Sequence, residues 1–124
     1  MSSKPKILIA EDDKFISRAL CDGLGRAGFE AIPAHDGLEA LAKIRSAKPD
    51  LILLDIIMPN KNGFEVLSEI KKENEFNKIP IIILSNLGQE SDIKQGEELG
   101  ADDYLIKSNV PMKEVIEKVK KLLK

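Results

Sequence analysis

The chain has 124 residues, enough for one domain with a buried core but too few for two. Its composition, 43% hydrophobic and 32% charged, is that of a globular protein rather than a disordered one. A net charge of -2 predicts no direct binding to nucleic acid, and no apolar stretch approaches the roughly 20 residues that a membrane span needs.

The beginning of the chain and its cysteine content both predict a cytoplasmic protein. The segment MSSKPK does not resemble a secretory leader, because the apolar run after it is short and ends in acids. Cys21 is the only cysteine, so no intramolecular disulfide can form. We interpret it as a small buried thiol in an amphipathic stretch.

Short apolar runs alternate with longer amphipathic ones along the whole sequence. The short runs are predicted strands: KILIA (6–10), EAIPA (30–34), LILLD (51–55), IPIIILS (79–85) and DYLIK (103–107). The central runs are continuously apolar rather than alternating, which is typical of parallel strands covered on both faces.

Helix-end signals lie between these runs. Two residue pairs have the spacing of a capping box: Asp36 with Glu39, and Asn62 with Glu65. Gly28 and Gly100 each follow an amphipathic run, where a helix can end in the left-handed conformation that glycine tolerates. Pro111 suits a first helical turn.

This order of elements predicts an α/β fold, a single-domain (βα)5 doubly wound parallel sheet. Crossovers through helices are right-handed and place helices on both faces of such a sheet. Ligands bind beyond the carboxyl ends of the strands. The residues that follow each strand are therefore the candidate functional residues.

Polar side chains gather at this predicted edge. They are Glu11, Asp12 and Asp13 after the first strand, Asp55 and Ser85 at the ends of the third and fourth, and Lys107 at the end of the fifth. At about 5 Å and an effective dielectric constant near 20, each pair of carboxylates would repel by roughly 3 kcal/mol. A shared function therefore explains the clustering of these polar residues better than a separate surface role for each of them.

A hard divalent cation would relieve this repulsion. Mg²⁺ prefers oxygen ligands, whereas the cluster lacks the His and Cys ligands that favour zinc. We interpret His35, which has no companion ligand, as a surface or loop residue. Metal, ammonium and hydroxyl around a carboxylate suit phosphoryl transfer. The acceptor could be a substrate or Asp55 itself.

Four stretches match the response-regulator receiver domain in order, spacing and position. They are ILIAEDD, LLDIIMPNKNG, IIILS and GADDYLIK. The chain resembles this CheY-like phosphoacceptor module of two-component signalling over essentially its whole length. The resemblance implies a flavodoxin-like sheet with strand order 2-1-3-4-5 and one receiver (response regulatory) domain over residues 1–124.

The resemblance also implies roles for matching residues. Asp55 matches the aspartate that is phosphorylated, and Ser85 and Lys107 match the two side chains that then bind the phosphoryl group. Tyr104 matches the aromatic switch residue, and Gly63 matches the glycine that opens the third helix.

The metal ligands implied by the resemblance come from two strand ends. Glu11 and Asp12 match the acid pair, with Asp12 touching Mg²⁺ directly and Glu11 acting through water. Asp55 and the backbone carbonyl of Ile57 complete the protein ligands, and Mn²⁺ can substitute for Mg²⁺. Asp13 is not part of this acid pair, and we expect it at the start of the first helix.

Two residues depart from the family pattern. Ser108 follows Lys107 where the family usually has proline, often after a cis bond, so we expect either a trans bond or a strained cis one. Asn86 follows Ser85 where a small residue is usual. Its amide is expected to bond near the phosphoryl site or to narrow access to it.

The implied function is a signalling switch. A sensor histidine kinase, a phosphotransfer protein or a small acyl phosphate would phosphorylate Asp55. The surface of the fourth helix, fifth strand and fifth helix would then regulate an effector protein or an output domain absent from this chain. We expect a monomer or a phosphorylation-dependent dimer. The protein would catalyse its own phosphorylation and dephosphorylation without turning over a separate substrate. Apolar Ile57 and Leu87 predict slow autodephosphorylation.

Three other classes fit less well. GLGRAG (23–28) has the form of a dinucleotide fingerprint, but it lies at a predicted helix end rather than directly after a strand. An aspartate-dependent phosphoesterase would need a cap or lid, for which the chain has no spare residues. An interaction module without chemistry would not need Asp12, Asp55, Ser85 and Lys107 together.

Overall fold

The computed structural model describes residues 4–124, so the first three residues of the MSSKPK segment lie outside it. Its strands are β1 (Lys6–Ala10), β2 (Glu30–Ala34), β3 (Leu51–Leu54), β4 (Ile81–Ser85) and β5 (Asp103–Ile106). Its helices are α1 (Lys14–Arg26), α2 (Gly37–Ala47), α3 (Gly63–Lys71), α4 (Glu90–Glu98) and α5 (Met112–Leu122). The strands form one parallel sheet in the order β2-β1-β3-β4-β5, which confirms the predicted fold class and strand order.

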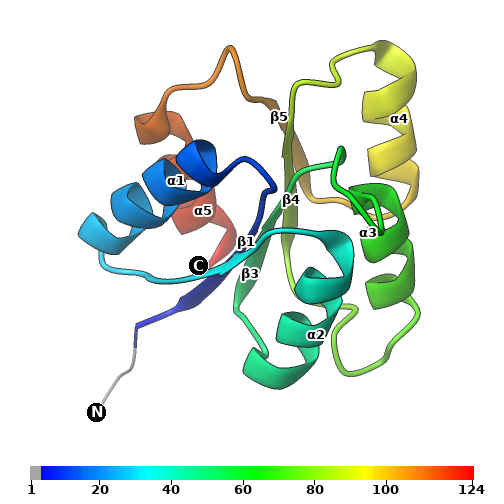
Figure 1. The fold of residues 1–124 in the computed structure, drawn as a ribbon, viewed down its shortest axis with the longest axis horizontal. Helices are drawn as coiled ribbons and strands as arrows, with labels where there is room; N and C mark the ends of the chain where they lie inside the picture. The colour runs from blue at the N-terminus through cyan, green and yellow to red at the C-terminus, as the bar shows by residue number, and fades with distance from the viewer. Residues whose placement is uncertain (1–3) are drawn as a thin grey trace.

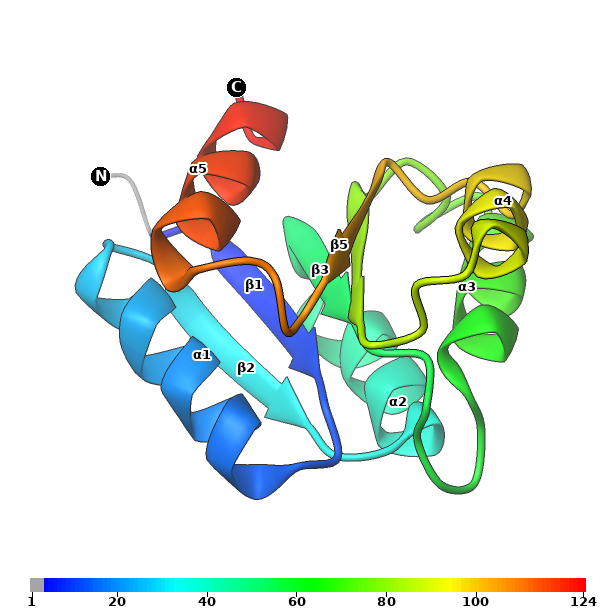
Figure 2. The same ribbon diagram turned by 90° about the horizontal axis from the view of Figure 1, so that it is seen from above.

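Helices cover both faces of the sheet. Figures 1 and 2 show α1 and α5 on one face and α2, α3 and α4 on the other. Residues of β1 alternate between the two cores, because Ile7 and Ile9 pack toward α1 and α5 while Leu8 and Ala10 pack toward the opposite helices. All of β3 is buried. This two-sided burial explains why the central strands are continuously apolar.

Three predicted strand limits differ from the structure. β4 begins at Ile81 rather than at residue 79, because Pro80 has no N–H for the ladder, although its carbonyl still accepts the Ile52 N–H at 3.0 Å. β3 and β5 each end one residue early. Asp55 and Lys107 consequently lie just past their strands.

Local capping behaves largely as the spacing predicts. Asn62 and Glu65 form a complete capping box at the start of α3. Asp36 caps α2 by accepting the Glu39 N–H at 2.7 Å. The reciprocal half of this second box is absent, because the Glu39 carboxylate accepts the N–H of His35 instead. His35 itself is exposed, as predicted.

The remaining expectations concern helix ends and Cys21. Gly28 and Gly100 have φ of 99° and 102°, which confirms the predicted left-handed positions. Pro111 is the N-cap of α5 rather than part of its first turn. Cys21 is half-buried against the core under α1 and α5, so it is less buried than predicted.

Within residues 4–124, the structure contains no helix with both the length and the apolarity for a membrane span.

Candidate functional site

Main-chain hydrogen bonds continue past the strand ends and hold the predicted functional residues. The Glu11 N–H donates to the last carbonyl of β2 at 2.9 Å, and the Asp55 N–H donates to the last carbonyl of β1 at 3.0 Å. The Lys107 N–H donates to the carbonyl of Ser85 at 3.0 Å. The sheet therefore delivers these residues to one edge with defined backbone positions.

A cavity of about 380 Å³ opens at this edge. The predicted site residues that line it are Glu11, Asp12, Asp55, Ile57, Ser85 and Lys107. Asp55 and Ser85 are almost fully buried, whereas Asp12 is exposed. The Ile57 side chain is 60% exposed at the rim. Tyr104, on β5, lies outside the cavity lining.

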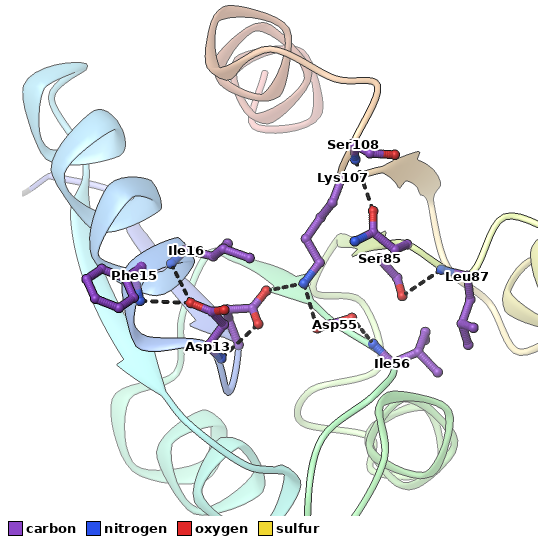
Figure 3. A network of polar contacts seen from close by, with 11 residues as sticks. Asp13, Phe15, Ile16, Asp55, Ile56, Ser85, Leu87, Lys107 and Ser108 are labelled. Atoms are coloured by element: carbon purple, nitrogen blue, oxygen red, sulfur yellow. Dashed lines mark hydrogen bonds and ion pairs between the residues drawn. The ribbon is translucent and has the colours of Figure 1, made fainter.

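Lys107 joins two of the acids. Its Nζ lies 2.6 Å from Glu11 Oε1 and 2.8 Å from Asp55 Oδ2, as Figure 3 shows for Asp55. Burial lowers the pKa of the Lys107 ammonium, but its hydrogen bonds to Asp55 and Glu11 outweigh this effect and the pKa is raised. The lysine is therefore held in its charged form between the two carboxylates.

For the Glu11 carboxyl, burial has a larger effect on the pKa than the hydrogen bonds do. Its side chain is only 2% exposed, and burial raises the pKa of its carboxyl despite the hydrogen bonds from Lys107 and from the Asp13 N–H at 3.0 Å. Asp55 accepts the Ile56 N–H at 2.7 Å in addition to the lysine. The repulsion expected from the sequence is thus relieved in part by a cation that the chain itself supplies.

The acids have the donor set of a hard-cation site. Glu11, Asp12 and Asp55 each offer a carboxylate oxygen, and these oxygens lie within 4.8 Å of one another. Oxygen donors fit Mg²⁺ or Mn²⁺. Asp13 does not join them, because its Oδ1 accepts two N–H groups from the first turn of α1 at 2.9 and 3.0 Å. The structure thus supports the choice of Glu11 and Asp12 as the pair.

A second chain of contacts leads away from the cavity. The Ser85 hydroxyl oxygen accepts the Leu87 N–H at 3.3 Å, and the Tyr104 hydroxyl donates to the Leu87 carbonyl. Burial first, and then the charges of Asp92 and Asp55, raise the pKa of the Tyr104 phenol. Leu87 therefore connects the serine at the site to the tyrosine on β5.

Two long-range hydrogen bonds at this edge were not predicted. Asn86 lines the cavity, so its amide lies near the site as expected, but its partner was not foreseen: Asn86 Oδ1 accepts the Ser108 N–H at 3.0 Å. The Lys107–Ser108 bond is trans. Asn60, with φ of 69°, donates to the Asp36 carboxylate at 2.9 Å. No local pattern signals either contact, because the partners are 22 and 24 residues apart.

Comparison with known proteins points to one family. The model of the response regulator receiver domain matches residues 7–120. The chain is 40% identical over 119 residues to the alkaline phosphatase synthesis transcriptional regulatory protein PhoP of Bacillus subtilis (strain 168), a match that covers 96% of this chain and 48% of that protein. The chain spans about half the length of the curated relatives it matches.

Solved structures agree with this match. The receiver domain of the Francisella response regulator 1452 superposes with a TM-score of 0.90 at 35% identity and 97% coverage of both chains. The Mn²⁺-bound form of response regulator Rcp1 superposes with a TM-score of 0.80 at 34% identity, covering 95% of this chain and 91% of that one.

Proposed function

Because the chain belongs to the response regulator receiver domain family, we propose that it is a phosphorylation-controlled switch whose phosphoryl acceptor is Asp55. The observation that carries the proposal is the position of this carboxylate. It is buried, binds the Lys107 ammonium at 2.8 Å, and lines the same cavity as Ser85 and the Glu11–Asp12 pair. We further propose that residues 1–124 form one receiver unit.

In the proposed reaction, an Asp55 oxygen attacks the phosphorus of a phosphohistidine or a small acyl phosphate. The new bond is an acyl phosphate, and the bond from phosphorus to the donor nitrogen or oxygen breaks. Lys107 is already at the carboxylate and can transfer a hydrogen bond to a phosphoryl oxygen. The Ser85 hydroxyl accepts from Leu87, which leaves its own hydrogen available for a second phosphoryl oxygen.

The three acids and the Ile57 carbonyl are the proposed ligands for Mg²⁺, and Mn²⁺ is a proposed substitute. The Mn²⁺-bound Rcp1 structure supports this assignment, as does the all-oxygen donor set of Glu11, Asp12 and Asp55. A bound divalent ion would neutralise charge on the phosphoryl oxygens.

The contacts of Leu87 suggest how the signal leaves the site. When Ser85 turns toward the phosphoryl group, its bond with the Leu87 N–H changes, and Leu87 also accepts from Tyr104. We expect this to change the Tyr104 rotamer and the surface of α4, β5 and α5. The protein would thus shift between two populations according to the charge at Asp55.

The proposed partners follow from the family and from the relatives. Two-component signalling requires a phosphodonor, which we propose to be a sensor histidine kinase or a phosphotransfer protein. PhoP is a transcriptional regulatory protein about twice as long as this chain. The regulated partner would therefore be a separate effector protein or an output domain, and the receiver would act as a monomer or as a phosphorylation-dependent dimer.

Incubation with acetyl phosphate and Mg²⁺, followed by intact mass measurement, tests the proposal. We expect one phosphoryl group per chain, none in Asp55→Asn, and an unchanged level in Asp22→Asn, which alters an exposed acid on α1. Normal phosphorylation of Asp55→Asn would reject Asp55 as the acceptor. Rapid, repeated turnover of acetyl phosphate would instead indicate a phosphatase, and no modification of any variant would indicate a module without chemistry.

A further inference from the structure

The turn that carries Lys107 leaves the N–H groups of its two central residues without a partner inside the turn. The carbonyl of Ile106 accepts the Asn109 N–H at 3.0 Å, so residues 106–109 form a β-turn with Lys107 and Ser108 at its centre. In such a turn the third residue has no partner for its N–H within the turn. Here that residue is Ser108.

Asn86 provides the missing partner. Its Oδ1 accepts the Ser108 N–H at 3.0 Å, as the dashed line at Ser108 in Figure 3 shows. The preceding N–H, that of Lys107, donates to the Ser85 carbonyl. Two successive N–H groups of the turn are therefore bound by two successive residues at the end of β4. Because the Ser108 N–H can donate only to the oxygen of the Asn86 amide, this oxygen, and not the NH2 group, faces the turn.

The backbone at residue 107 determines where the lysine side chain can reach. Lys107 Nζ makes bonds of 2.6 and 2.8 Å to Glu11 and Asp55, and its side chain is 13% exposed. A rotation of the turn would move the ammonium relative to its two acids, and the lysine side chain would have to change rotamer to keep both bonds. Asn86 and Lys107 also line the same cavity as Asp55.

We propose that Asn86 is a positioning residue for Lys107. Its hydrogen bond with the Ser108 N–H holds the turn at residues 106–109 against the end of β4. The Lys107 ammonium is thereby placed to contact Asp55 and the phosphoryl group formed there. The proposal rests on the function proposed above and assigns it one more residue. It also links the two departures from the family sequence, because a proline at position 108 would have no N–H for Asn86 to accept.

A double-mutant cycle tests the proposal. The variants are Asn86→Ala, Ser108→Pro and the combination of both, with Asn74→Ala as a control at an exposed asparagine in the loop before β4. The first measurement is the rate constant of phosphorylation by acetyl phosphate at saturating Mg²⁺. Loss of one hydrogen bond should lower it about threefold to tenfold in Asn86→Ala. In the Ser108→Pro background, the same replacement should change it less than about twofold.

Two measurements on the unphosphorylated protein separate this proposal from the proposed function. By NMR, Asn86→Ala should speed hydrogen exchange of the Ser108 amide and of the Lys107 ammonium, while Asn74→Ala should change neither. If Asn86→Ala slows phosphorylation equally in both backgrounds, or leaves the Lys107 ammonium unaltered, the positioning role is wrong. If the wild-type protein takes no phosphoryl group while the NMR effects occur, the proposed function fails and the positioning of Lys107 stands.

Discussion

Replacing Gly63 with alanine would displace the backbone at Asp55, the proposed phosphoryl acceptor. Gly63 is the first residue of α3, and its N–H donates to the Ile56 carbonyl at 2.9 Å. A Cβ at this position would lie 2.1 Å from the carbonyl oxygen of Asp55 and 2.9 Å from Cα of Ile56. Both are backbone atoms, so no side chain can rotate to make room.

The clash outweighs the better helix propensity of alanine. An ordinary contact begins at 3.4 Å, so the helix start and the Asp55 carbonyl must separate by more than 1 Å. Overpacking of this kind costs about 1–3 kcal/mol, whereas alanine gains at most about 0.5–1 kcal/mol in a helix interior. Since a 1 Å misplacement can lower a rate about 100-fold, we expect phosphorylation of Asp55 to slow about tenfold or more.

The assay combines urea denaturation with acetyl phosphate labelling followed by intact mass. Gly25→Ala is the matched control, because a Cβ on Gly25 in α1 meets no atom within 4 Å. It should raise the free energy of unfolding by about 0.5–1 kcal/mol and leave the labelling rate unchanged. Wild-type stability and labelling rate in Gly63→Ala would refute the packing argument.

Three further predictions concern the apolar residues Ile57 and Leu87 of the cavity, the ring of Tyr104, and the N-cap of α3. The double variant Ile57→Asn, Leu87→Glu should shorten the lifetime of the acyl phosphate several-fold, because it admits water to the phosphoryl group. The lifetime is measured as loss of the phosphoryl label after the phosphodonor is removed. An unchanged lifetime would show that these side chains do not shield the acyl phosphate. Gly96→Ala places a Cβ 2.7 Å from Ile83 Cδ1 and 3.2 Å from the Tyr104 ring, so it should displace the ring. Tyrosine fluorescence would report this displacement, because Tyr104 is the only tyrosine and the chain has no tryptophan, and unaltered emission would contradict it. Asn62→Ala should lower the free energy of unfolding by about 1 kcal/mol in urea denaturation, because it removes half of the capping box; no loss would mean that the cap adds nothing.

Features that depend on neighbouring residues could be predicted from the sequence. The continuous apolar run at residues 51–54 indicated a strand buried on both faces, and β3 is buried throughout. Asn62 with Glu65 indicated the start of α3. The position of Asp55 at a strand end followed from the same patterns, because parallel strands all end at one edge. The exact strand limits were wrong by one or two residues, and Pro111 proved to be the N-cap of α5 rather than part of its first turn.

Tertiary structure alone decided which polar groups far apart in the sequence touch. Lys107 binds Asp55, 52 residues away, and also Glu11, 96 residues away. Asn86 meets Ser108 because the ends of β4 and β5 lie side by side in register. Such contacts depend on the paths of several loops, and their hydrogen bonds tolerate only a few tenths of an ångström. The sequence by itself therefore determined which residues reach the site edge, while only the folded chain determined how the Lys107 ammonium is shared between two acids and held there.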